Sequence, residues 1–85
     1  MDSGGQELVA LVRTLRRIRV AADLSQQRLA KALGVRQSTI SKYESGERQV
    51  GFIELRRICG VLGLTLADFV ALFEATLRDQ AEDPK

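Results

Sequence analysis

Apolar residues recur at intervals of three and four along most of the chain, which is the spacing of helices that bury one face. The first such row predicts a helix from about residue 6 to residue 22 and consists of Leu8, Leu11, Leu15 and Ile18. No segment alternates apolar and polar positions for long enough to form a strand. The pattern therefore predicts an all-α protein.

Capping residues and glycines divide the rest of the chain into four more helices. The hydroxyls of Ser25 and Thr65 can cap the starts of two of them, and a glycine follows the end of each of the first three. Asp23 stands at the turn after the first helix and is expected to adopt a left-handed conformation. The four helices are predicted at about residues 26–33, 37–45, 52–62 and 66–78.

These elements make up one small domain, because 85 residues are too few for two independent cores. We expect the folded domain to span residues 6–78. The remaining segments, residues 1–5 and the acidic tail at residues 79–85, are expected to be flexible.

The residue inventory excludes most catalytic chemistry. The sequence has no histidine and one cysteine, Cys59, so it cannot assemble a Ser/His/Asp triad, a Cys/His pair or a zinc site rich in these residues. No paired carboxylates and no set of nucleophile and base are visible. We therefore expect no enzyme activity, no metal and no cofactor, and we interpret Cys59 as a core residue rather than a redox sensor.

The sequence shows no leader peptide and no membrane segment. Its longest apolar runs, at residues 8–12 and 69–73, are five residues each, far short of the ~20 residues of a membrane-spanning helix. A lone cysteine makes no internal disulfide, which fits a reducing compartment. We expect a cytoplasmic protein without a membrane partner.

The net charge of +2 conceals an uneven distribution. Residues 13–57 carry eleven arginines and lysines against four acidic residues, a net charge of +7, whereas residues 1–12 carry −2 and residues 58–85 carry −3. A basic middle segment suits a polyanionic partner, although an ordinary solvated surface can have the same composition.

Residues 25–46 predict a helix-turn-helix, two short helices joined by a three-residue turn that a glycine opens. Leu29, Ala30 and Ile40 are apolar where the two helices must cross, and Ala30 is small where they come closest. The outward positions of the second helix are hydrogen-bonding residues, which suits a helix that reads base edges in the major groove of DNA. They are Gln37, Ser38, Ser41 and Lys42, with Thr39 partly outward.

The segment LSQQRLAKALGVRQSTISKYESG, from Leu24 to Gly46, resembles the phage-repressor/Cro-like family, also called XRE. The resemblance covers roughly residues 12–72 and includes Arg48 and the sequence LGLTL at residues 62–66. It implies a compact five-helix, lambda-repressor-like domain. It also implies sequence-specific binding of double-stranded DNA, usually as a dimer.

The resemblance also implies roles for individual residues. Gln26 would brace Gln37, and an ion pair between Arg19 and Glu44 would tie the first helix to the recognition helix. Base contacts are implied for Gln37, Ser38, Thr39, Ser41 and Lys42, and phosphate contacts for Gln26, Arg36, Tyr43, Arg48 and Arg19.

Two departures from the family pattern affect these roles. Arg36 stands where the recognition helix usually has a Ser or Thr cap, so a cap of ~1 kcal/mol is lost and a cation is placed beside the DNA backbone. Val50 and Gly51 stand where a proline is common. We therefore expect a mobile loop around Arg48.

A single module makes too few contacts to select one genomic site, so we expect a homodimer on a palindromic operator. Residues 8–12 offer a second apolar surface that could join the interface. The main interface is predicted on the last helix, at Leu66, Phe69, Val70, Leu72, Phe73, Thr76 and Leu77.

The function predicted from these features is transcriptional regulation, by repression. The same fold also occurs in antitoxins, in restriction-modification controllers and in protein-interaction modules that have lost DNA binding. A regulatory protein partner therefore stays open as well. Gln26, Gln37 and Lys42 are retained here, which argues against a loss of DNA binding.

Overall fold

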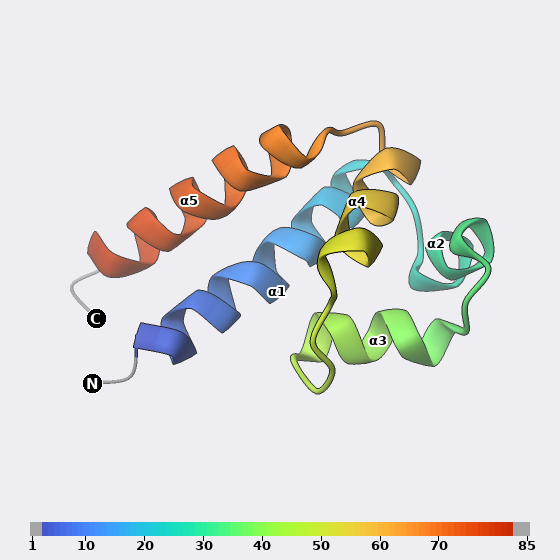
Figure 1. The fold of residues 1–85 in the computed structure, drawn as a ribbon, viewed down its shortest axis with the longest axis horizontal. Coiled ribbons are helices and arrows are strands. Elements are labelled where there is room, and N and C mark those ends of the chain that lie inside the picture. Colours follow the sequence, from blue (N-terminus) through green and yellow to red (C-terminus); the bar gives the residue numbers. More distant parts are fainter. Residues whose placement is uncertain (1–2, 83–85) are drawn as a thin grey trace.

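Residues 3–82, the part of the chain that this computed structural model describes, form five helices and no strand. The all-α prediction is confirmed, and the two helices of the predicted helix-turn-helix have the expected bounds. Among the same residues no single helix is long and apolar enough to cross a membrane; α4 and α5 pass that test only as a pair bent by 101°. The helices are α1 (Ser3–Ala21), α2 (Gln26–Leu33), α3 (Gln37–Ser45), α4 (Phe52–Val61) and α5 (Leu66–Glu82) (Figure 1).

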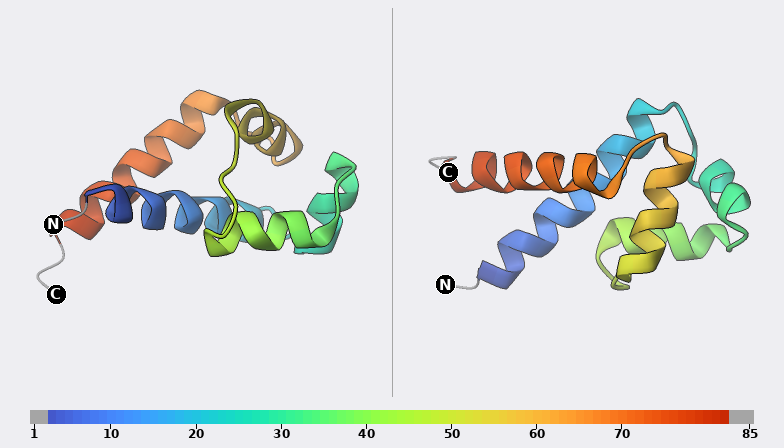
Figure 2. Two further views of the ribbon diagram at one scale, coloured as in Figure 1. Left: turned by 60° about the horizontal axis from the view of Figure 1, so that its bottom comes forward. Right: turned by 45° about the horizontal axis from the view of Figure 1, so that its top comes forward.

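The two long helices, α1 and α5, run antiparallel beside each other, and the three short helices gather where α1 ends and α5 begins (Figures 1 and 2). The short helices have eight, nine and ten residues, and isolated helices below ~12 residues are marginal in water. They depend on a shared core for their stability. Its buried members are Leu15, Ile18, Leu29, Ala30, Ile40, Tyr43, Ile58, Cys59 and Phe69.

Local interactions define most of the helix ends. Ser25 Oγ accepts a hydrogen bond from the Arg28 amide at 3.1 Å, as predicted for a cap. Thr65 and Asp68 form a capping box, in which each side chain accepts from the other residue's amide at 3.0 Å. Asp23 has φ 60°, the left-handed conformation expected at the first turn. These ends are set by residues that are close in sequence.

Both long helices extend beyond their predicted bounds, because Gln80 joins their outer ends. Its Nε2 donates to the Gln6 carbonyl oxygen at 3.0 Å, and its Oε1 accepts from Arg13 Nη1 at 3.0 Å. Residues 3–5 and 79–82, predicted to be flexible, are therefore helical. The rest of the two predicted flexible segments, residues 1–2 and 83–85, lies outside the described residues.

The buried face of α5 corrects the predicted dimer interface. Phe69 and Thr76 are each 2% exposed. Phe69 belongs to the core, and Thr76 Oγ1 lies 3.4 Å from Thr14 Oγ1 on α1. Thr76 is enclosed against α1, so its assignment to a partner-facing surface is wrong, and Phe69 packs largely in the core of its own chain.

Candidate nucleic-acid interface

The helices α2 and α3 cross closely through a tight turn. Leu29 and Ala30 are 2% exposed and Ile40 is 1% exposed, so the apolar contact predicted at the crossing is confirmed. Gly34 has φ 73°, a conformation that residues with a Cβ rarely adopt. The Val35 amide donates to the Ala30 carbonyl oxygen at 3.0 Å. Together these features fix the direction in which α3 leaves the turn.

The outer face of α3 is polar, whereas Ile40 and Tyr43 point into the core. Thr39 is half-buried at the edge of the outer face. A helix with hydrogen-bonding side chains on its first two turns has the shape and the donors and acceptors to enter a major groove. The exposed residues of this face include Gln37, Ser38, Ser41 and Lys42.

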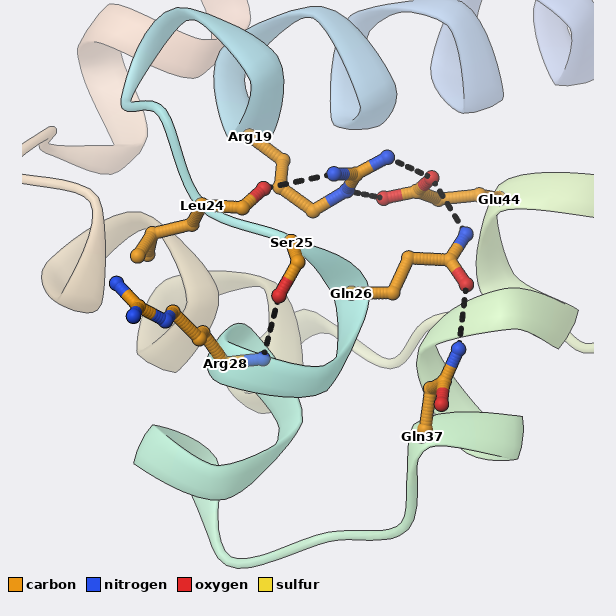
Figure 3. A network of polar contacts seen from close by, with 7 residues as sticks. All are labelled: Arg19, Leu24, Ser25, Gln26, Arg28, Gln37 and Glu44. Atoms are coloured by element: carbon orange, nitrogen blue, oxygen red, sulfur yellow. Dashed lines mark hydrogen bonds and ion pairs between the residues drawn. The ribbon is translucent and has the colours of Figure 1, made fainter.

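A chain of polar contacts runs from α1 through α2 to the start of α3 (Figure 3). Arg19 Nε donates to Glu44 Oε2 at 2.6 Å, and Arg19 Nη2 donates to Glu44 Oε1 at 3.0 Å. Gln26 Nε2 donates to Glu44 Oε1 at 3.0 Å, and Gln26 Oε1 accepts from Gln37 Nε2 at 3.5 Å. The Gln37 side chain is therefore oriented by the protein itself.

The Arg19–Glu44 pair anchors this chain of contacts. The two side chains are only 11% and 7% exposed. Hydrogen bonding to Glu44 raises the pKa of the Arg19 guanidinium, so Arg19 stays charged. Arg19 Nη1 also donates to the Leu24 carbonyl oxygen at 2.7 Å. The expected ion pair is confirmed.

The enclosure of Arg19 corrects its assignment to DNA phosphate. Its charge is neutralised by Glu44 and its three nitrogens all donate within the protein. A cation that is held in this way positions α1 against α3 rather than reaching for a ligand.

Three other predicted phosphate contacts lie at the two ends of α3. Arg36 is exposed and makes no side-chain cap, as expected. Tyr43 is 8% exposed, so its ring packs inward. The Arg48 guanidinium lies 5.9 Å from the centre of that ring, and the Arg48 amide donates to the Lys42 carbonyl oxygen at 3.2 Å. The loop that was expected to be mobile is thus anchored to α3.

A comparison with known families decides what this arrangement is. The model of a family described as helix-turn-helix matches residues 15–69, which include the whole turn and the helices on both sides. The chain belongs to the XRE-type helix-turn-helix family. The family assignment that the sequence suggested is confirmed, and regulation of transcription through DNA binding is the function of such proteins.

Individual relatives of this XRE-type helix-turn-helix protein agree with the assignment. A protein of Methanocella arvoryzae, whose name describes an HTH-type transcriptional regulatory protein, is 37% identical over 73 residues, 84% of this chain. The chain spans only 22% of that relative's length. Two crystal structures of the clp gene regulator ClgR from Corynebacterium glutamicum have TM-scores of 0.81 and 0.75 and identities of 28% and 27%. They cover 88% and 84% of this chain, and the matched regions are 80% and 91% of theirs.

Two further exposed cations of this helix-turn-helix, Arg28 and Lys31, lie beside the predicted contact residues. Arg28 borders an open concavity of about 490 Å³ at the start of α2, beside Ser25. Lys31 borders another of about 560 Å³ between α2 and α3, beside Gln37. Both residues could have been found from their outward positions, three residues apart, on the predicted second helix.

Cys59 lies in the core of the XRE-type domain, 0% exposed, as the sequence suggested. Burial raises the pKa of its thiol, so the thiol stays neutral and poorly nucleophilic. Within residues 3–82, no three His, Cys, Asp or Glu side chains are grouped as ligands for a metal ion.

Proposed function

We propose that this protein binds double-stranded DNA sequence-specifically as a homodimer and represses transcription from a palindromic operator. It acts in the cytoplasm, at the nucleoid. The observation that carries the proposal is the orientation of Gln37 by Gln26, Glu44 and Arg19 at the exposed start of α3. A side chain that is pre-ordered loses less entropy when it binds.

The unused hydrogen-bond donor and acceptor of the Gln37 side chain suit adenine. One Nε2 proton is donated to Gln26, so the second Nε2 proton and the Oε1 lone pairs are available. Adenine presents an acceptor at N7 and a donor at N6 in the major groove, and glutamine pairs with both. We therefore assign adenine to the base opposite Gln37.

The neighbouring residues of α3 complete the base contacts in this proposal. Lys42 suits the O6 and N7 acceptors of guanine, whereas the Ser38 and Ser41 hydroxyls can pair with several bases. Less of the Thr39 side chain is available for a base contact, because it is half-buried.

Phosphate contacts in the proposal surround the groove-facing helix. The amides of Gln26 and Gln27 begin α2 next to the exposed Ser25 and suit an anion, because the helix dipole is positive at this end. Arg36 and Arg48, at the two ends of α3, are exposed cations that can pair with phosphates on either side of the groove. Gln26 and the Tyr43 hydroxyl are the remaining candidates.

The proposed dimer surface is an apolar groove where α1, α4 and α5 meet. Phe52 stands at its edge and is 70% exposed, and Val70 is 52% exposed. A two-fold interface must present both a projection and a recess on one face, and Phe52 beside this groove meets that requirement. The groove has a volume of about 290 Å³ and is lined by Glu7, Leu11, Phe52, Leu55, Phe69, Val70 and Phe73.

This surface revises the interface that was expected along α5. Val70 and Phe73 border the groove, whereas Leu72, 37% exposed, lies on the other side of the buried row formed by Phe69 and Thr76. Leu66 and Leu77 are half-buried, and neither lines the groove. The part of α1 at Leu11 forms one wall of the groove, so α1 joins the proposed interface.

Selection of bound sites from random double-stranded DNA tests the proposal. We expect an enriched palindrome whose half-sites lie one helical turn apart, about 34–36 Å, because each copy would place α3 in a successive major groove. Each half-site should contain an adenine that the wild-type protein requires. Absence of any enriched motif would defeat sequence-specific binding, and an enriched motif without symmetry would defeat the dimer.

A further inference from the structure

Three exposed arginines of α1 have no role in the proposed DNA contacts. They are Arg13, Arg16 and Arg17, and they supply part of the positive charge of the middle of the chain. Arg13 donates to Gln80 on α5, which places it on the side of α1 that α5 covers. The neighbours of Arg16 show that it lies elsewhere.

The residues one turn before and after Arg16 both face the C-terminal end of α3. Val12 lies close to Gly46, directly after α3, because a Cβ atom placed on this glycine would be 3.8 Å from Val12 Cγ1. Arg19 holds Glu44 in the last turn of α3. Residues three and four apart are neighbours on a helix surface, so Arg16 lies beside Val12 and Arg19, between them along the helix axis.

The direction of Leu15 shows on which side of α3 Arg16 lies. Leu15 is 4% exposed and packs in the core near Ile40 and Tyr43, beneath α3. Consecutive residues are about 100° apart around a helix. Around the axis of α1, starting from Leu15, the side chains of Arg19 and Val12 come first, facing the end of α3. Arg16 comes next. Arg16 therefore lies farther from the core than the residues of α1 that face α3. It is on the same side of the molecule as the exposed outer face of α3.

The same side of α1 leads to the start of α2. Val20, one turn after Arg16, is 58% exposed and borders the concavity that Ser25 and Arg28 also line. Arg16 thus stands between the first amides of α2 and the last turn of α3. Both of these were proposed above as neighbours of the DNA backbone.

We infer that Arg16 contacts a phosphate of the DNA backbone between the phosphate at the start of α2 and the groove occupied by α3. The inference rests on the proposed DNA binding. Within residues 3–82, no hydrogen bond or ion pair holds the Arg16 side chain, whereas Arg19 is held by Glu44. The contact carries no base information, because phosphates are the same at every step.

The matched variants Arg16→Gln and Arg17→Gln test the inference. Both remove one exposed charge from adjacent positions of the same helix, but Arg17 lies one turn from Arg13 and Thr14, on the side of α5. Affinity for the selected site and for unrelated duplex DNA is measured between 50 and 300 mM salt, and thermal unfolding checks the fold of each variant.

Arg16→Gln should weaken binding to both DNAs by the same factor and lower the slope of log affinity against log salt by about 0.9, the value for one phosphate contact. Arg17→Gln should leave the slope unchanged. Equal slopes for the two variants would overturn the inference while the proposed function stands. Wild-type protein that selects no DNA site would instead overturn the proposed function.

Single neutral methylphosphonate substitutions along the selected site give a second readout. At one position the substitution should weaken wild-type binding but leave Arg16→Gln unaffected, because that contact is already lost. If every substitution weakens both proteins equally, Arg16 touches no phosphate.

Discussion

At the scale of single residues, Glu44 is the junction of the site. Its two carboxylate oxygens accept three hydrogen bonds, two from Arg19 and one from Gln26. The side chain is 7% exposed, so the attraction between the charges is weakly screened. Stability and the orientation of Gln37 therefore depend on the same carboxylate.

Replacement of Glu44 by glutamine should destabilise the fold. The Arg19 guanidinium would stay enclosed without a counter-charge, which costs about 3 kcal/mol for a buried pair. Urea denaturation measures the loss in the free energy of unfolding. Glu47→Gln is the control, because Glu47 is exposed two residues beyond α3 and should change stability by less than about 0.5 kcal/mol. Equal stability of the two variants would contradict the anchoring role of Glu44.

Replacement of Gln37 by alanine should relax the base preference at one position in each half-site. The lost pairing corresponds to about 1–3 kcal/mol of discrimination against other bases, measured by competition between sites that differ at that base pair. Gln6→Ala is the control, because only the backbone carbonyl of Gln6 is used in the fold. An unchanged base preference in the Gln37 variant would refute the contact.

At the scale of elements, local sequence predicted the short helices well and the long ones less well. The bounds of α2 and α3 follow from Ser25, Gly34 and Gly46, which act within a few residues. The outer ends of α1 and α5 depend on Gln80 and Gln6, which are 74 residues apart in the chain. No local pattern could indicate that contact.

The start of α3 is an uncapped end that a single substitution can change. Arg36 has the extended conformation of an N-cap, φ −77° and ψ 151°, but no capping hydrogen bond. Arg36→Ser should raise the free energy of unfolding by about 1 kcal/mol and, through the lost charge, weaken binding to all DNA sequences with a shallower salt slope.

Thermal unfolding and salt titrations of DNA binding measure these two effects. Arg36→Ala is the matched control, since it loses the charge without supplying a cap. It should share the weaker DNA binding but not the gain in stability. A serine variant no more stable than the alanine variant would show that the cap is not formed.

At the scale of the whole molecule, the fold separates two surfaces. The polar outer face of α3 and the groove at α1, α4 and α5 have no residue in common. Binding of a second copy in the groove therefore leaves Gln37 free. This separation is what a dimeric DNA-binding protein requires.

Val70→Asp tests the dimer surface without disturbing the core. Val70 is 52% exposed, so the substitution should fold but place a charge in the proposed interface. Sedimentation equilibrium should show a monomer and a weaker affinity for the palindrome. Val61→Asp is the control, because Val61 is 38% exposed on α4 outside the groove. A variant that remains as dimeric as the control would remove this groove from consideration.

The sequence by itself determined the helices, the helix-turn-helix and the identity of the outward residues on α3. These follow from apolar periodicity, from caps and from side-chain chemistry, which all act over a few residues. Tertiary structure decided the rest: that all three nitrogens of Arg19 donate within the protein, that Phe69 and Thr76 are buried in a single chain, and that Gln80 joins the outer ends of the long helices. These features depend on contacts between different helices, such as that of Thr76 with Thr14, 62 positions apart, and such contacts exist only once the helices are packed.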